Sequence, residues 1–174
     1  SIIGRNNPQK NHSTFFKAIS KLPKNLNLVF MLIKKIIPFL KKKYIKIYRK
    51  ELFKKIYFYN EKKNIFNFYK LIDLNILPSI YGESFPNVVA ETMSFGIPNI
   101  ASNIGDAKKI IGKNGIILSN PNSSEELSHK ILKMYKIWNN KKKWEFIQKK
   151  CSHHIKKKYN LLKTIKKYKE LFDR

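Results

Sequence analysis

Two carboxylates separated by eight positions are the side chains of this sequence that are best placed to do chemistry. Glu83 stands in a segment rich in Pro, Gly and Ser, and Glu91 stands in the apolar run that follows. If a helix begins near Asn87, its free backbone amides point toward the Glu83 segment and can hold an anion such as a diphosphate. Glu91, one turn further along, can accept hydrogen bonds from the two hydroxyls of a ribose. The pair therefore predicts a site for a ligand that carries both groups.

Other chemistries find less support among the residues. His153 and His154 would point about 100° apart on a helix, and no carboxylate or Cys lies at ligand spacing, so we predict no metal site. Cys151 is the single cysteine of the sequence, which rules out an intramolecular disulfide and fits a reducing cytoplasm. The sequence has no P-loop and no Gly-x-Gly-x-x-Gly run, which argues against an ordinary nucleotidase or dinucleotide enzyme.

The elements that must position the two carboxylates alternate between strand and helix patterns. Expected strands cover residues 1–4, 27–33, 56–59, 74–77, 97–101 and 115–118. Expected helices cover residues 14–22, 36–55, 64–71, 87–95 and 106–111, with another after Ser123 and basic helices between 141 and 174. This order predicts an α/β fold with a Rossmann-like, six-stranded parallel sheet, helices on both faces, and ligands at the carboxyl ends of the strands.

Particular residues mark where these helices begin and end. Gly96 suits a left-handed cap just after the helix expected at 87–95. Ser123 and Glu126 form the Ser-x-x-Glu pattern of a capping box. Asp106 is predicted to cap the short helix that follows it.

Composition sets the size of the unit and its charge. With 174 residues, the chain fits one domain, or one domain with a tail. Its 37 Lys and Arg against 11 Asp and Glu give a formal net charge of +26, which favours any polyanion, whether nucleic acid, acidic lipid or nucleotide. The lysines are spread along the chain beside abundant Ile, Asn, Phe and Tyr, a bias that AT-rich coding also produces. Charge alone therefore names no partner.

The residues around the two carboxylates resemble the Glu-x7-Glu region of family 4 (group 1) retaining glycosyltransferases. The matching run is Pro78-Ser79-Ile80-Tyr81-Gly82-Glu83-Ser84-Phe85-Pro86-Asn87-Val88-Val89-Ala90-Glu91. Further matches to the family, in order, are Ser1 to Arg5 with Lys10-Asn11, Gly96-Ile97-Pro98, Ser102 to Gly105, and Gly115. The chain is thus similar, over nearly its whole length, to the C-terminal half of an enzyme with the GT-B fold.

This resemblance implies roles for particular residues. The residues implied in catalysis are Glu83, beside the donor sugar, and Arg5 and Lys10, which would grip the donor diphosphate. The residues implied in donor binding are Glu91 at the ribose and Gly4, Ser84, Phe85, Asn87, Val88 and Gly105. Sugar transfer leaves negative charge on the departing diphosphate, and fixed cations with helix-terminal amides can stabilise that charge. We therefore expect neither a metal nor another cofactor.

The resemblance also implies an activity and a domain division. The activity is that of a hexosyltransferase-type enzyme, moving a sugar with retention from a nucleotide-diphosphate sugar to a glycan or lipid-linked acceptor in polysaccharide or glycoconjugate biosynthesis. Residues 1–140 would form the donor-binding domain and 141–174 a helical tail. The N-terminal acceptor domain would be missing, so the chain alone should be inactive.

Charge supports an alternative function, a basic module that binds nucleic acid or an anionic membrane without catalysis. Salt should discriminate the two, because polyanion binding collapses steeply as salt rises. For the transferase we expect a nucleotide sugar as partner, no specific nucleic acid, and a cytoplasmic location. A peripheral position on the inner face of the cytoplasmic membrane, against its anionic surface, stays open.

Overall fold

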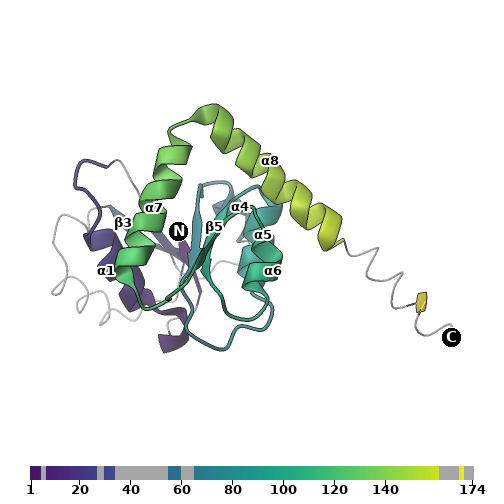
Figure 1. Cartoon of the computed structure of the whole chain (residues 1–174), viewed down its shortest axis with the longest axis horizontal. Helices are drawn as coiled ribbons and strands as arrows, with labels where there is room; N and C mark the ends of the chain where they lie inside the picture. Colours follow the sequence, from purple (N-terminus) through teal and green to yellow (C-terminus); the bar gives the residue numbers. More distant parts are fainter. Residues whose placement is uncertain (5–6, 27–29, 34–54, 60–64, 161–168, 171–174) are drawn as a thin grey trace.

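The computed structural model describes residues 1–4, 7–26, 30–33, 55–59, 65–160 and 169–170. Strands and helices alternate along them (Figure 1). The strands are β1 (Ile2–Ile3), β2 (Phe30–Ile33), β3 (Ile56–Tyr59), β4 (Asn75–Leu77), β5 (Asn99–Ser102) and β6 (Ile116–Leu118). The helices are the 3-10 turn η1 (Pro8–Lys10), α1 (His12–Ser20), α4 (Phe66–Tyr69), α5 (Asn87–Ser94), α6 (Ala107–Ile111), α7 (Ser124–Trp138) and α8 (Lys141–Lys158). The helix expected at 36–55 lies outside the described residues except for its last position.

In the described part of the chain, the strands form two three-stranded parallel sheets, ordered β1-β2-β3 and β4-β5-β6. The predicted α/β fold is confirmed, but the prediction of one six-stranded sheet is wrong. The reason lies where β1 and β4 meet. Ser1 donates its backbone nitrogen to the carbonyl of Leu74 and accepts from the amide of Ile76 at 2.8 Å, as in a parallel pair. These bonds use Ser1, which precedes β1, so they join the two sheets without extending a ladder along β1.

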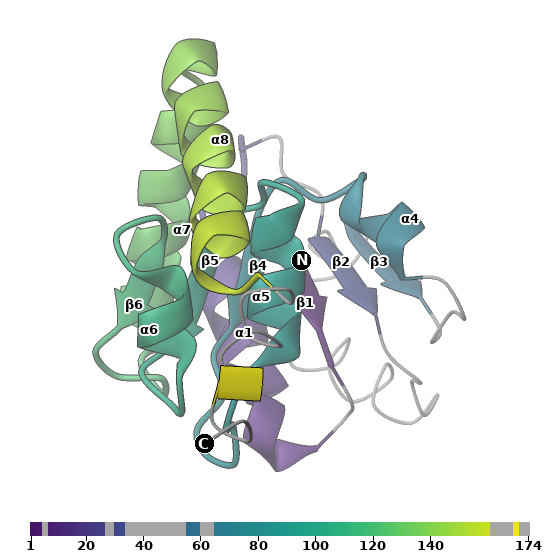
Figure 2. The same cartoon turned by 90° about the vertical axis from the view of Figure 1, so that its right-hand side faces the viewer.

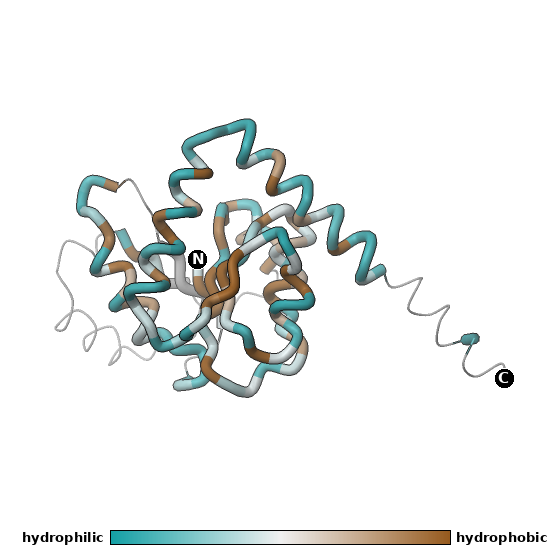
Figure 3. The backbone as a smooth tube through the Cα atoms, viewed as in Figure 1, coloured by the Kyte–Doolittle hydropathy of each residue, from teal (hydrophilic) through white to brown (hydrophobic). Residues whose placement is uncertain are grey.

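Helices cover both faces of the strands because neighbouring strand residues point to opposite faces. Ile76 and Ile100 pack into a cluster with α1 and α7, whereas Leu77 and Ala101 pack into a second cluster with α5, α6 and α8. Figures 1 and 2 show these layers, and Figure 3 shows the apolar strands between polar outer surfaces. The chain leaves β1 for α1 on one face and leaves β4 for α5 on the other.

Of the three residues predicted to cap helices, Gly96 and Ser123 do so and Asp106 does not. Gly96 has a φ of 80°, which confirms the left-handed cap after α5. The Ser123 hydroxyl accepts from the amide of Glu126 at 3.0 Å, as a capping box requires. The Glu126 carboxylate instead binds the amides of Ser119 and Asn120 at 2.9 and 2.8 Å, so the reciprocal half of the box is replaced by contacts that hold the preceding loop.

Asp106 does not cap α6 with its side chain, so that prediction is wrong. Its backbone, at φ −87° and ψ 10°, departs from the extended conformation typical of an N-cap residue. The carboxylate oxygen Oδ1 lies 2.8 Å from the Nζ atom of Lys109, and this hydrogen bond, together with the charge of Asp106, raises the pKa of Lys109.

The last long helix, α8, turns back from α7 and packs against α5 (Figure 1). Its buried side is formed by Trp144, Cys151 and Ile155, which belong to the two core clusters. Burial raises the pKa of the Cys151 thiol to about 12. The division of the chain at residues 140 and 141 stays a prediction. Among the helices that the structure describes, none has the length and apolar character needed to cross a membrane.

Candidate functional site

The candidate site lies where β1 and β4 end, because the chain leaves these neighbouring strands toward opposite faces. Ligands of open α/β sheets bind outside the carboxyl ends of the strands at such a point. The segment that follows β1 contains Lys10, and the segment that follows β4 contains Glu83. Both of these segments were expected to contribute to the site.

Lys10 and Glu83 form an ion pair in which Lys10 Nζ lies 2.5 Å from Glu83 Oε1. The same carboxylate oxygen accepts a hydrogen bond from the Ser79 hydroxyl at 2.7 Å. The two charged side chains are only 16% and 10% exposed, so their attraction is screened less than that of a surface pair. The structure thus joins a cation from one strand end to a carboxylate from the next.

Local backbone chemistry places Lys10 at this position. Asn7 accepts a hydrogen bond from the amide of Lys10 at 3.2 Å, and Pro8 occupies the first position of η1, where a missing amide costs nothing. Asn11 ends the turn with a φ of 49°. The Lys10 side chain then runs past Gly4, where an added Cβ would lie 3.1 Å from Lys10 Cε. Gly4 therefore leaves the space that Lys10 uses to reach the carboxylate.

Gln9 provides a second connection between the two segments. Its side-chain nitrogen Nε2 donates to the carbonyl of Gly82 at 2.8 Å. Its own carbonyl accepts from the amide of Ile80 at 3.0 Å. The loop that carries Glu83 is thus held by backbone contacts as well as by the ion pair.

Gly105 lets the loop after β5 lie close to the backbone of Glu83 and Ser84. A Cβ at Gly105 would lie 2.1 Å from the carbonyl oxygen of Glu83 and 2.4 Å from that of Ser84, and the φ of Gly105 is +56°. Asp106 donates its amide to the Ser84 carbonyl at 2.8 Å. Only glycine fits here, because both the φ and the distance exclude a side chain.

The amino end of α5 adds unpaired donors beside Glu83. Pro86 occupies the N-cap and provides no side-chain hydrogen bond. Within the described residues, the first amide of α5 with a hydrogen-bond partner is that of Val89, which donates to the Pro86 carbonyl at 2.9 Å. The amides of Asn87 and Val88, which precede it, have no partner there. Such amides, together with the helix dipole, favour an anion. Phe85, 41% exposed, packs edge-on against Tyr159, with ring centroids 5.6 Å apart.

Glu91 lies further along α5 and has a different partner. Its Oε2 atom accepts a hydrogen bond from the Tyr69 hydroxyl at 2.5 Å. Tyr69 is buried, and its ring packs edge-on against Phe66 and Phe95 at centroid distances of 6.0 and 5.3 Å. Burial first, and the Glu91 hydrogen bond second, raise the pKa of Tyr69. Val88 of the same helix packs in a cluster with Tyr69 and with β1.

The structure therefore brings together part of the sequence-predicted residues. Contacts join Lys10, Glu83, Gly4, Gly105 and Ser84. Phe85 packs against Tyr159, and Asn87 and Val88 begin α5, with Val88 in the cluster of Tyr69. Arg5 lies outside the described residues. Glu91 shares α5 with Asn87 and Val88 and binds Tyr69. Among the described residues, no three His, Cys, Asp or Glu side chains are grouped so that they could hold a metal ion.

Three contributing residues escaped the sequence analysis. Ser79 stands four positions before Glu83, a polar residue in the same loop that could have been noticed. Gln9 precedes Lys10 but has no pattern of its own. Tyr69 falls on the helical spacing of apolar residues, so its sequence position indicates core packing alone.

Comparison with known proteins places this geometry in context. A profile of the family described as glycosyl transferases group 1 matches residues 2–150. A crystal structure of a glycosyltransferase from Rickettsia africae is 26% identical, with a TM-score of 0.85 over 98% of this chain and 46% of that one. The chain therefore spans less than half the length of that protein. No curated protein sequence matches the chain.

Two more distant structures share the fold. HepE of Anabaena, crystallised with UDP, is 19% identical, with a TM-score of 0.78 over 99% of this chain and 48% of that one. The catalytic domain of a cholesterol-alpha-glucosyltransferase from Helicobacter pylori is 22% identical, with a TM-score of 0.68 over 88% of this chain and 95% of that one.

Proposed function

The chain belongs to the group 1 glycosyl transferases, and we propose that it binds the nucleotide-diphosphate sugar from which such an enzyme transfers a sugar. The observation that carries this proposal is the contact of Lys10 with Glu83 beside the uncapped amino end of α5. The UDP bound by HepE of Anabaena supports a nucleoside diphosphate as the donor's leaving group.

In this proposal the positive groups hold the diphosphate. The Lys10 ammonium and the free amides of Asn87 and Val88 follow the carboxyl ends of β1 and β4. The resemblance to the family assigns Arg5 the same role. As the bond between the sugar and the diphosphate breaks, negative charge grows on the departing oxygen. Cations and amides that are already in place stabilise this charge without a metal ion.

The carboxylates recognise hydroxyl groups in the same proposal. Glu91 accepts hydrogen bonds from the ribose, with its carboxylate oriented by Tyr69. Glu83 lies beside the donor sugar and holds Lys10 near the diphosphate. The acceptor oxygen attacks the sugar carbon from the side that the diphosphate leaves, the configuration is retained, and the acceptor proton passes to the departing diphosphate. Glu83 forms no covalent bond to the sugar.

The acceptor belongs to the whole enzyme rather than to these residues. We propose a hexosyl transfer to a glycan or lipid-linked acceptor in polysaccharide or glycoconjugate biosynthesis. Since the chain spans less than half the length of the Rickettsia africae structure, a second domain would hold the acceptor. The 174 residues alone should bind the donor and transfer little sugar.

Calorimetric titration with UDP, GDP, ADP and their sugars tests the donor site. The wild type should prefer one nucleotide, and Glu91→Ala should weaken the binding of that nucleotide at least tenfold by removing the ribose acceptor. Glu145→Ala is the matched control, because Glu145 is an exposed carboxylate on α8. Equal weak binding of every nucleotide by all three proteins would reject the donor site.

Salt separates this proposal from a basic binding module without catalysis. Non-specific polyanion binding falls steeply as salt rises. A pocket that binds the hydroxyls of the donor sugar should keep its preference among nucleotide sugars at high salt, even as the absolute affinity decreases.

A further inference from the structure

One face of α8 forms a basic groove separate from the candidate site. With Asn114 of the turn between α6 and β6, this face encloses a hollow of about 800 Å³. Its lining residues on α8 are Phe146, Lys149, Lys150, His153, His154, Lys157 and Lys158. They recur at intervals of three and four, so they share one side of the helix. The opposite side buries Trp144, Cys151 and Ile155. We call the lining residues of α8 the basic face.

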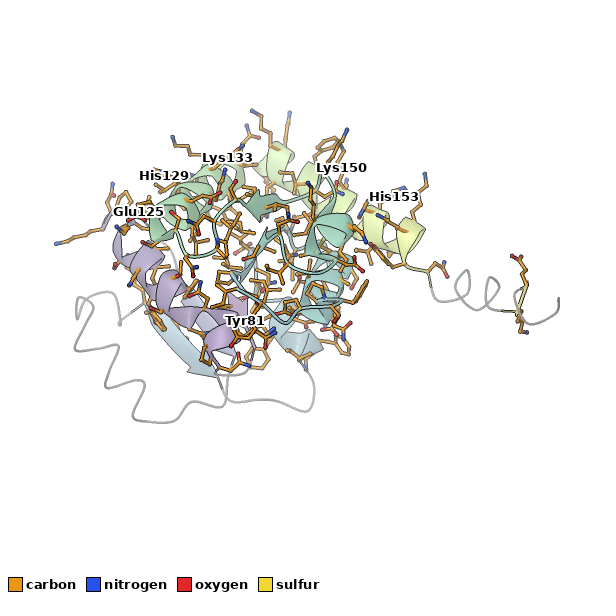
Figure 4. All side chains as sticks on the ribbon, turned by 60° about the horizontal axis from the view of Figure 1, so that its bottom comes forward. Tyr81, Glu125, His129, Lys133, Lys150 and His153 are labelled. Carbon is orange, nitrogen blue, oxygen red and sulfur yellow. The ribbon has the colours of Figure 1, made fainter. Side chains whose placement is uncertain are left out.

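The basic face itself contains no acidic residue, and Glu145 directly precedes it in the sequence. Residues 146–158 contain five Lys, two His and neither Asp nor Glu. Three lysines elsewhere in the described chain have carboxylate partners, namely Lys10 with Glu83, Lys21 with Glu125, and Lys109 with Asp106. Figure 4 shows Lys150 and His153 on α8, apart from Glu125, His129 and Lys133 on α7. The positive charge on this side is thus concentrated, whereas elsewhere part of it is paired.

We propose that the basic face docks onto a membrane surface that contains anionic phospholipids. Phe146, 57% exposed, stands at one end of it, and the Lys150 ammonium lies 4.4 Å from the centre of its ring. An exposed ring among lysines can enter the headgroup region while the ammonium groups meet lipid phosphates. Nucleic acid fits less well, because a single exposed ring offers no row of stacking surfaces for successive bases.

The basic face ends beside the candidate site. Tyr159, just after α8, packs against Phe85 of the loop that carries Glu83. Lys158 donates its ammonium to the carbonyl of Lys109 in α6 at 3.1 Å. Docking would therefore hold the donor loop close to the membrane. If the proposed function holds, this position favours an acceptor carried by a lipid, although the membrane contact itself does not depend on sugar transfer.

Cosedimentation of the 174-residue chain with vesicles tests the docking. Vesicles of phosphatidylcholine alone are compared with vesicles in which half of the lipid is phosphatidylglycerol. The test variant replaces Lys149, Lys150, Lys157 and Lys158 with Ala. The control variant replaces Lys17, Lys70, Lys133 and Lys136 with Ala; these lysines are exposed on α1, just after α4 and on α7 and give an equal change in net charge.

The wild type should bind the vesicles that contain phosphatidylglycerol and should not bind the vesicles of phosphatidylcholine alone. A lysine near such a surface strengthens binding by roughly fivefold, so the test variant should lose about two to three orders of magnitude. The control should lose much less. Phe146→Ala should weaken vesicle binding several-fold while leaving heparin binding unchanged.

Three outcomes would overturn the proposal. Equal losses in the test and control variants would mean that only net charge matters. If the wild type bound neither kind of vesicle, the basic face would not be a membrane-docking surface. If it bound RNA but no vesicles, the basic face would be a nucleic-acid-binding surface instead. Circular dichroism verifies folding, and UDP titration of the same variants separates a failure of docking from a failure of the donor site.

Discussion

Lys10 Nζ and Glu83 Oε1 lie 2.5 Å apart although 73 residues separate them in the sequence. The pair connects the segment after β1 to the segment after β4, and these are the two strands through which the sheets exchange hydrogen bonds at Ser1. Ser79 binds the same carboxylate oxygen, so the charge of Glu83 is shared between a cation and a hydroxyl. The site thus depends on a contact between distant parts of the chain.

Removal of either charge should destabilise the fold. Lys10→Met and Glu83→Gln should each lower the free energy of unfolding by about 1–3 kcal/mol, since each leaves a partly buried partner without its counter-charge. The double variant should lose less than the sum, because no unpaired charge remains. Urea denaturation of the four proteins gives the coupling energy. Strictly additive losses would mean that the pair has no interaction in solution.

Gly105→Ala should be far more damaging than Gly82→Ala. Both glycines have a positive φ, +56° and +70°, so both variants share a backbone strain of about 1–2 kcal/mol. At Gly105 the new Cβ would also meet the backbone carbonyl of Glu83 at 2.1 Å, whereas at Gly82 it would meet the flexible side chain of Gln9 at 3.0 Å. We expect an additional loss of about 1–3 kcal/mol at Gly105.

Thermal denaturation and UDP titration measure this difference. The Gly105 variant should also bind nucleotide more weakly, because the Glu83 loop must shift. Similar melting temperatures and affinities for the two variants would contradict the close backbone contact.

Tyr69 should keep its proton well above the pH at which exposed tyrosines ionise. Burial and the hydrogen bond to Glu91 both raise its pKa from 10.0. Because the folded state holds this proton longer than the unfolded chain, the stability that Tyr69 contributes is complete below about pH 10 and decreases as the pH rises further. Glu91→Ala should lower the pKa of Tyr69 by removing both the hydrogen bond and the negative charge of Glu91.

Tyrosine labelled with carbon-13 at the ring carbon Cζ permits this measurement by NMR. Tyr69→Phe identifies the signal among the nine tyrosines and retains the ring that packs with Phe66 and Phe95. A Tyr69 signal that titrates with that of exposed Tyr81 would be incompatible with the hydrogen bond.

Cys151 should resist thiol reagents in the native protein. Burial raises the pKa of its thiol to about 12, so the reactive thiolate is scarce at neutral pH. Its sulfur also donates a hydrogen bond to the Asn114 carbonyl at 3.2 Å. The rate of labelling with Ellman's reagent should rise in step with unfolding by urea. Rapid labelling before the unfolding transition would indicate that α8 separates easily from the domain.

The sequence by itself determined the order of the elements and indicated the chemistry of one segment. Strand and helix periods predicted β3 at its observed bounds, and Gly96 predicted the end of α5, because both depend on residues that are neighbours in the chain. The resemblance around Glu83 and Glu91 indicated a donor site for the same reason, since it lies within a single continuous segment.

Only the tertiary structure decided which side chains meet. It paired Lys10 with Glu83 and Tyr69 with Glu91, and it turned Asp106 toward Lys109 instead of the helix end. It also divided the strands into two sheets, which exchange the described hydrogen bonds at Ser1, before β1 begins. Some of these contacts join residues that are distant in the sequence, and in others two groups compete for the same partner. The local periodicity of the sequence contains no information about which contact forms in either case.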